Sequence, residues 1–223
     1  MIPWEQLDSS PVPGSDRELL LYRRGEEFSI RVAGCELMNS RMHGSEEALA
    51  EYACGRMAGI SAPRILLGGL GMGFTVKAAL QVLGADARLV VAELVPRVVA
   101  WNRDQLAALA GHPLDDPRVT VRESDVCEVI MEEKASWDAI LLDVDNGPNG
   151  LTSSANDRLY GPSGLQAAFC ALRPGGLLAV WSVAAAPAFT RRLQHTGFTV
   201  EEVPVRARGT RGGRHIIWLA RRT

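Results

Sequence analysis

The sequence predicts an α/β fold built on one mainly parallel sheet with helices on both faces. From residue 64 onward, short apolar runs alternate with longer helical segments, and this alternation is typical of parallel strands joined by crossover helices. The last two strand-like segments, 198–207 and 214–222, follow each other without a helix between them, so we expect an antiparallel hairpin at the end of the sheet. Before residue 60 the pattern changes and predicts a small β-hairpin extension.

Length and composition exclude several classes of protein. The chain has 223 residues, of which 47% are hydrophobic and 22% are charged, and its formal net charge is −2. This length predicts one domain with room for a small appendage. The balanced charge predicts no nucleic-acid partner and no attraction to anionic lipid. The most apolar stretch, 175–190, is too short to span a bilayer and contains Ser182 and Pro187, so we expect no membrane segment.

The cysteines and the first residues bear on the cellular compartment. The four cysteines form no C-x-x-C pair, and we interpret them as reduced thiols. The first sixteen residues lack the basic and apolar regions of a secretory signal. We therefore expect a cytoplasmic protein without a structural metal.

The N-terminal part, residues 1–60, is predicted to hold an arm, a hairpin and a helix. Residues 1–16 are proline-rich and predict a loose arm. Segments 19–24 and 27–32 alternate around a Gly-Glu pair, which is typical of a β-hairpin. A serine followed by two glutamates opens a predicted helix over 45–59.

Residues 61–223 are predicted to form the catalytic domain. Its apolar runs are of the kind found in strands buried on both faces, and the expected strands before the final hairpin are 65–69, 87–94, 118–125, 137–145 and 177–183. The expected helices begin at a proline or end at a glycine or proline, and they are 74–84, 96–111, 163–174 and 187–197.

A glycine loop follows the first of these strands. Gly69, Gly71 and Gly73 stand between an apolar strand and a helix, where glycine permits a sharp turn and lets a ligand approach the backbone. The start of the next helix offers free N–H groups to an anionic group. Phe74 occupies the place of the third glycine in the dinucleotide motif, which disfavours a nicotinamide dehydrogenase.

Two acidic residues follow the second and third strands of the predicted domain. Glu93 lies about twenty residues past the glycine loop, where an acid accepts hydrogen bonds from ribose hydroxyls. Asp125 can accept a hydrogen bond from an adenine amino group, or it can simply cap the helix that begins after it. Together with the glycine loop, these acids predict a nucleoside crevice along one edge of the sheet.

The fourth strand ends in the sequence DVDNGP. Asp143 and Asp145 are therefore candidate catalytic residues that anchor an amine and remove its proton. A Mg²⁺ site is the rival interpretation, because hard cations prefer carboxylate oxygens. A turn cap is the third alternative.

With these motifs in chain order, the sequence resembles class I S-adenosylmethionine-dependent transferases and, among them, the spermidine synthase group. The matching stretches are RILLGGLGMGFTVKAAL, VVAELVPRVV, DDPRVTVRESD, WDAILLDVDNGP and LRPGGLLAVWS. The resemblance implies a Rossmann-like sheet of order 3-2-1-4-5-7-6 with strand 7 antiparallel. It also implies that S-adenosylmethionine, or its decarboxylated form, binds with its tail on the glycine loop, its ribose on Glu93 and its adenine on Asp125. Asp143 stands in the place of the catalytic aspartate, and members of the group tend to form homodimers.

The sequence departs from the spermidine synthases at the acceptor side. Met72 replaces the loop aspartate that grips the cofactor's amine, and Asn146 replaces a second aspartate. The acceptor-lining tyrosine aligns with Leu49, although Glu51 is kept. A pocket for polycations loses two carboxylates in this way, and each buried charged hydrogen bond contributes about 1.5–3 kcal/mol.

These departures favour methyl transfer from S-adenosylmethionine to a small amine-containing acceptor. Aminopropyl transfer to a diamine is the first alternative, and a non-catalytic nucleoside-binding module is the second. The polar segment 149–160 is predicted to form a lid, in which Asn156, Asp157 and Tyr160 contact the acceptor, or else a plain surface loop. Arginines in the loop 206–214 predict either a clamp for an anionic group or a solvated turn.

Overall fold

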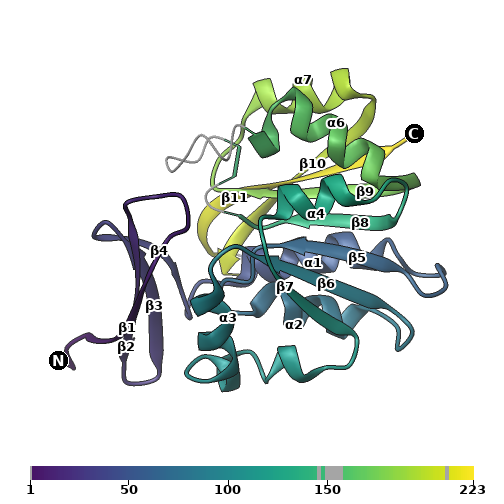
Figure 1. Cartoon of the computed structure of the whole chain (residues 1–223). Helices are drawn as coiled ribbons and strands as arrows, with labels where there is room; N and C mark the ends of the chain where they lie inside the picture. Colours follow the sequence, from purple (N-terminus) through teal and green to yellow (C-terminus); the bar gives the residue numbers. More distant parts are fainter. Residues whose placement is uncertain (1, 145–146, 149–157, 209–210) are drawn as a thin grey trace.

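The computed structural model describes residues 2–144, 147–148, 158–208 and 211–223. A small antiparallel sheet, formed by the N-terminal residues, stands beside a larger sheet that is covered by helices (Figure 1). In the described part of the chain, no helix combines the length and the apolar character that crossing a bilayer requires.

The N-terminal sheet has four strands in the order β1-β2-β3-β4. Their bounds are Glu5–Pro11 for β1, Glu18–Arg24 for β2, Glu27–Val32 for β3 and Cys35–Asn39 for β4. The predicted hairpin is confirmed as β2 and β3. The predicted loose arm is wrong for residues 5–11, which pair with β2. The segment is largely polar and only Ser10 is buried in it, so its strand depends on pairing across the sheet, which local propensity does not reveal.

A group of polar side chains connects the small sheet to α3, a helix that covers the large sheet. Asp8 of β1 accepts hydrogen bonds from Arg97 Nε at 2.5 Å and from Trp101 Nε1 at 2.7 Å. Both donors belong to α3, which spans Pro96–Arg103. The Arg97 and Trp101 hydrogen bonds lower the pKa of Asp8 from 3.8 to about 2.

We predict that Asp8→Ala lowers the free energy of unfolding by about 1–3 kcal/mol at pH 7, because it removes a charged hydrogen-bond pair. Since the folded-state pKa lies below the unfolded one, this contribution is present above pH 4 and is lost as the pH falls towards 2. Urea unfolding at pH 7 and pH 2 measures both effects. Glu5→Ala is the control, because the Glu5–Arg23 pair is exposed and should change stability by less than about 0.5 kcal/mol. Equal effects of the two substitutions at pH 7 would contradict the prediction.

The large sheet has seven strands in the order β10-β11-β9-β8-β5-β6-β7. Their bounds are Arg64–Gly68 (β5), Arg88–Glu93 (β6), Val119–Glu123 (β7), Trp137–Leu142 (β8), Leu172–Ser182 (β9), Phe198–Arg208 (β10) and Arg211–Arg222 (β11). Among the described strands of this sheet, β11 runs antiparallel to both of its neighbours, β9 and β10, and the other pairs are parallel. Counted from β5, this is the order 3-2-1-4-5-7-6 with strand 7 antiparallel, so the predicted topology is confirmed.

Helices cover both faces of this sheet (Figure 1). The remaining helices are α1 (Gly44–Gly55), α2 (Phe74–Val82), α4 (Val126–Glu132), α6 (Pro162–Ala171) and α7 (Pro187–Thr196), with short 3₁₀ turns at Ala107–Leu109 and Pro113–Asp115. One apolar core holds α1, α2 and α3 against the sheet, and the other holds α4, α6 and α7.

Two element boundaries differ from the sequence-based expectation. Residues 172–174, expected at the end of a helix that stops at Pro174, already belong to β9. The helix expected over 96–111 ends at Arg103 and continues as a 3₁₀ turn. The domain division near residue 60 stays a prediction, although α1 shares its core with strands of the large sheet.

Candidate functional site at the carboxyl edge of the sheet

The predicted site residues lie at the carboxyl ends of four neighbouring strands, β8, β5, β6 and β7. Gly68 at the end of β5 pairs with Ala92 of β6 and with Leu142 of β8. The loops that follow continue this pairing, since Gly69 N donates to Ala92 O and Asp143 N donates to Gly68 O, both at 2.9 Å. The glycine loop, Glu93, Asp125 and Asp143 therefore lie along one edge, where parallel α/β sheets bind ligands.

The glycine loop has a backbone that other residues adopt only under strain. Gly69, Gly71 and Gly73 have φ angles of +89°, +54° and +82°. A Cβ at Gly69 would lie 2.4 Å from the carbonyl oxygen of Asp143, and one at Gly71 would lie 3.1 Å from Met38 Sδ of β4. The three glycines thus form a tight turn, which we call the cradle, in front of α2. Its role in holding the cofactor's tail stays a prediction.

Gly69→Ala should lower the free energy of unfolding by about 2–4 kcal/mol and abolish cofactor binding, because a side chain there combines left-handed strain with a backbone clash. Gly175→Ala is the matched control: its φ is +78°, but a Cβ there meets nothing within 4 Å. Thermal unfolding and calorimetry with S-adenosylhomocysteine measure the two effects. If both variants lost the same stability and both bound S-adenosylhomocysteine, a side chain at residue 69 would not clash with the Asp143 carbonyl, and the prediction would be wrong.

Glu93 holds the cradle in place. Its side chain is buried, and its two oxygens accept hydrogen bonds from Leu70 N at 2.8 Å and Val95 N at 2.9 Å. The first bond reaches into the glycine loop and the second into the turn before α3. A carboxylate has about four lone-pair positions, so these bonds are compatible with a ribose role, which stays a prediction.

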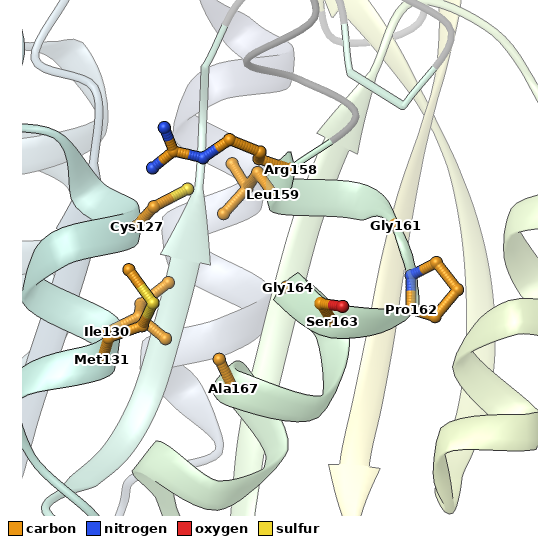
Figure 2. Close-up of a pocket in the computed structure, with 10 residues that line it drawn as sticks. All are labelled: Cys127, Ile130, Met131, Arg158, Leu159, Gly161, Pro162, Ser163, Gly164 and Ala167. Atoms are coloured by element: carbon orange, nitrogen blue, oxygen red, sulfur yellow. The ribbon is translucent and has the colours of Figure 1, made fainter.

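Asp125 caps α4, as one of its two interpretations predicted. Its Oδ1 accepts a hydrogen bond from Cys127 N at 2.8 Å, and its Oδ2 lies 3.7 Å from Arg158 Nη2. A pocket of about 400 Å³ opens beside Arg158, between α4 and α6 (Figure 2). It is lined by Cys127, Ile130, Met131, Arg158, Leu159, Gly161, Pro162, Ser163, Gly164 and Ala167. The adenine role of Asp125 stays a prediction.

Asp143 is partly buried and is held by the first turn of α2. Thr75 Oγ1 donates a hydrogen bond of 2.6 Å to Asp143 Oδ2. Burial raises the pKa of Asp143 from 3.8 to about 6, against the lowering effect of Thr75. A carboxylate with a pKa close to neutral is suited to accept a proton from an amine.

Glu46 of α1 is a candidate residue that the sequence analysis missed. Burial, followed by the charge of Asp143, raises its pKa well above 4.5. An acid in the first turn of a helix is ordinarily explained by the helix dipole, so no local signal pointed to a site. Only the fold makes Asp143 one of the charges that raise the pKa of Glu46.

An aromatic pair on β9 and β11 was also missed. Trp181 and His215 stack with their ring centres 4.9 Å apart, and burial lowers the pKa of His215. Trp181 Nε1 and His215 Nδ1 are buried and have no hydrogen-bond partner within the described ranges. Only the pairing of β9 with β11 makes these two residues neighbours.

The acceptor contacts predicted for Glu51 and Tyr160 stay predictions. Glu51 is exposed on α1, and five residues of helix place it about 140° around the axis from Glu46. Tyr160 is only 1% exposed and packs edge-to-face on Phe189 at 5.6 Å. Tyr160 is therefore a core residue of the face covered by α6 and α7.

Other predicted positions are buried or fall outside the described residues. Met72 is 1% exposed and belongs to the core under α1 and α2. Asp145, Asn146, Asn156 and Asp157 lie outside the described residues. In the part of the chain that the structure describes, no three His, Cys, Asp or Glu side chains are grouped as metal ligands.

The arginine loop is only partly described. Arg206 Nη1 donates to Gly212 O at 3.4 Å, within the hairpin itself. Because β10 runs parallel to β5 and β8, this hairpin does emerge at the carboxyl edge. The clamp for an anionic group stays a prediction.

Comparison with known proteins identifies the fold. No family model and no curated protein matches the sequence. The crystal structure of spermidine synthase from Thermotoga maritima matches with a TM-score of 0.76 and 16% identity, over 98% of this chain and 73% of that chain. This is the fold of the spermidine synthases. A probable spermidine synthase from Corynebacterium glutamicum gives a TM-score of 0.68 and 18% identity over 98% of this chain and 80% of its own. The 1,6-didemethyltoxoflavin-N1-methyltransferase of Burkholderia thailandensis was solved with 1,6-didemethyltoxoflavin and S-adenosylhomocysteine. It matches with a TM-score of 0.58 and 15% identity, over 81% of this chain and 79% of that chain.

Proposed function

We propose that the chain is an S-adenosylmethionine-dependent transferase that alkylates an amine-containing small molecule. The observation that carries the proposal is the convergence of three features on one sheet edge: the glycine cradle, buried Glu93, and Asp143 with a pKa of about 6. The spermidine synthase and methyltransferase folds of the neighbours support it.

The cradle and the strand tips fit the cofactor's parts. In this proposal the glycine loop holds the cofactor's tail, Glu93 accepts hydrogen bonds from the ribose, and Asp125 accepts one from the adenine. When bound, S-adenosylmethionine supplies an electrophilic methyl group on a positively charged sulfur. Asp143 orients the acceptor nitrogen and takes its proton, and most of the acceleration comes from holding the reacting atoms in line in a dry site.

Methyl transfer is favoured over aminopropyl transfer by the composition of the glycine loop. The spermidine synthase pattern implies an aspartate where Met72 stands, and Met72 is buried in an apolar core. The loop therefore has no carboxylate to bind the amine of the decarboxylated cofactor. The ordinary cofactor carries a carboxylate in its tail, which this uncharged loop does not repel.

Aminopropyl transfer to a diamine is the second candidate. It is supported by the first neighbours, one of which is a spermidine synthase in complex with the transition-state analogue AdoDATO, with a TM-score of 0.75 and 16% identity. The partly buried acids Glu46 and Asp143 are also compatible with a cationic acceptor.

Calorimetry with the two sulfonium compounds separates the candidates. We expect S-adenosylmethionine to bind at least tenfold more tightly than decarboxylated S-adenosylmethionine, because only the first matches an uncharged loop. The opposite preference would favour aminopropyl transfer. Binding of either compound without turnover on any amine would indicate a non-catalytic nucleoside-binding module.

A further inference from the structure

Two stacked rings on β9 and β11 each bury a nitrogen that no described residue hydrogen-bonds. The nitrogens are Trp181 Nε1 and His215 Nδ1, and the ring centres lie 4.9 Å apart with the planes at 26°. Trp218, on the other face of β11, shows the ordinary arrangement, because its Nε1 donates to Thr190 Oγ1 at 3.0 Å. A buried donor without an acceptor is unfavourable, so the indole N–H of Trp181 points to a missing partner.

The strand register places Trp181 beside Asp143. Leu142 of β8 pairs with Val180 of β9, so the next residues along the two strands, Asp143 and Trp181, occupy neighbouring positions. Trp181 packs against the core that α1 and α2 cover, and Asp143 accepts its hydrogen bond from Thr75 of α2. The indole ring and the candidate catalytic carboxyl therefore lie on the same face of the sheet.

His215 continues this row on the next strand. Ile217 of β11 pairs with Trp181, and His215, two residues away from Ile217, has its side chain on the same face. The strands β8, β9 and β11 are neighbours in the sheet. Asp143, Trp181 and His215 thus follow one another across three adjacent strands at the carboxyl edge of β8 and β9.

Aromatic rings also approach Asp143 from the helices. The His43 ring, just before α1, stacks on Phe74 with the ring centres 3.9 Å apart and the planes at 13°. Phe74 precedes Thr75, which donates to Asp143 at 2.6 Å. One aromatic stack therefore lies on the α2 side of the carboxyl and the other lies on its β9 side, an environment that suits a flat ring.

The hydrogen-bonding capacity of the indole excludes a simple polyamine as the missing partner. Trp181 Nε1–H can only donate, and an ammonium group can only donate as well. A carbonyl oxygen or a ring nitrogen of a ligand can accept the bond. Burial lowers the pKa of His215, so the ring that stacks on the indole is uncharged at neutral pH and does not repel an uncharged aromatic ligand.

The base strength of Asp143 favours the same kind of ligand. Its pKa is about 6, whereas an aliphatic ammonium such as that of lysine has a pKa of about 10.4, so a proton passes from such an ammonium to Asp143 only at a large cost. An amino group on a heteroaromatic ring is uncharged at neutral pH. It becomes acidic only when alkylation places a positive charge on its nitrogen, and a base of the strength of Asp143 is then sufficient.

We infer that the acceptor is a planar heteroaromatic amine that packs against the stacked pair and accepts a hydrogen bond from Trp181 Nε1. The inference rests on the proposed function, since it names the substrate class of the same site. In the transfer, the amine lone pair forms a bond to the methyl carbon, the carbon–sulfur bond breaks, and its electrons stay on sulfur as a neutral thioether. The alkylated nitrogen gives one proton to ionised Asp143, which later releases it to solvent.

Trp181→Phe tests the inference, because phenylalanine keeps an aromatic ring and removes the N–H. Trp218→Phe is the matched control, since it removes an indole N–H on the other face of the sheet. Calorimetry at saturating S-adenosylhomocysteine compares isocytosine, a planar amine with acceptor atoms, with aniline, which has a ring without them, and with 1,4-diaminobutane, which has no ring. Isocytosine should bind about tenfold more tightly than the other two, or better. Trp181→Phe should weaken isocytosine binding about fivefold or more and leave the affinities for aniline and S-adenosylhomocysteine unchanged, and Trp218→Phe should change none of them.

The second measurement is an NMR titration of the indole N–H signals, assigned through the backbone, and it needs only the wild-type chain. Isocytosine should move the Trp181 signal downfield, as a new hydrogen bond does, and aniline should not.

Three results would overturn the inference: tighter binding of 1,4-diaminobutane than of isocytosine, equal isocytosine affinity in the wild-type chain and Trp181→Phe, or a Trp181 signal that isocytosine does not move. A chain that binds S-adenosylhomocysteine but not isocytosine would also overturn it and would leave the proposed cofactor site intact. Failure to bind S-adenosylhomocysteine would instead refute the proposed function, and the NMR titration, repeated without the cofactor, would still decide on the ligand of Trp181.

Discussion

Asp143→Asn should abolish transfer and at the same time stabilise the fold at alkaline pH. Loss of the proton acceptor is expected to reduce the rate by about 10²–10⁴-fold. The stability effect follows from the pKa, which burial raises from 3.8 to about 6. A folded-state pKa above the unfolded one gives stability that is present below pH 4 and is lost as the pH rises through 6.

Asparagine does not ionise, so the variant does not lose this stability as the pH rises. At pH 8 we expect Asp143→Asn to raise the free energy of unfolding by about 1–3 kcal/mol, because a tenfold change in an acid dissociation constant corresponds to about 1.4 kcal/mol and the side chain is only partly buried. At pH 4 the gain should vanish. Denaturant unfolding at the two pH values measures it, and Asp16→Asn at an exposed position serves as the control. A variant that keeps full activity, or one equally destabilised at both pH values, would show that Asp143 is not a strained proton acceptor.

Glu93→Ala should have the largest effect on the cofactor site. The substitution leaves Leu70 N and Val95 N without their acceptor, and each unsatisfied buried donor costs about 1–3 kcal/mol. We therefore expect the free energy of unfolding to fall by about 2–5 kcal/mol. Affinity for S-adenosylhomocysteine should fall at least 100-fold, because both the ribose acceptor and the anchor of the glycine loop are lost.

Two further variants separate these roles. Glu93→Gln keeps one oxygen acceptor and should show an intermediate effect on stability. Glu123→Ala is the control, because Glu123 pairs with Glu93 across β6 and β7 and is exposed at the same edge. Denaturant unfolding and calorimetry measure both quantities. If Glu93→Ala bound S-adenosylhomocysteine with the affinity of the wild-type chain, Glu93 would not be part of the cofactor site.

The fold of the large sheet could be predicted because its buried strands are apolar runs that can be recognised in the sequence. β8 is buried along its whole length, and its sequence is an almost unbroken apolar run. β1 carries no such signal, since its residues are mainly polar and its strand exists through pairing with β2. Strands of this kind form because of their contacts with neighbouring strands in the fold, and local propensity does not reveal them.

The same contrast holds for the site. Gly69 and Glu93 lie at the ends of buried strands, so their place at the carboxyl edge could be predicted from the chain. Glu46 could not be found in this way, because an acid in the first turn of a helix already has an ordinary explanation in the helix dipole. The packing of Tyr160 could not be predicted either, because it ends a polar segment of the sequence and only the fold brings its ring against Phe189.

A crystal structure of the chain with S-adenosylhomocysteine is the decisive experiment for the nucleoside crevice. We expect the adenosine to lie across the ends of β5, β6 and β7, with both ribose hydroxyls hydrogen-bonded to Glu93 and the sulfur facing Asp143. Crystals grown at saturating ligand in which this edge stays empty, or in which the ligand binds away from Glu93, would refute the proposed cofactor site.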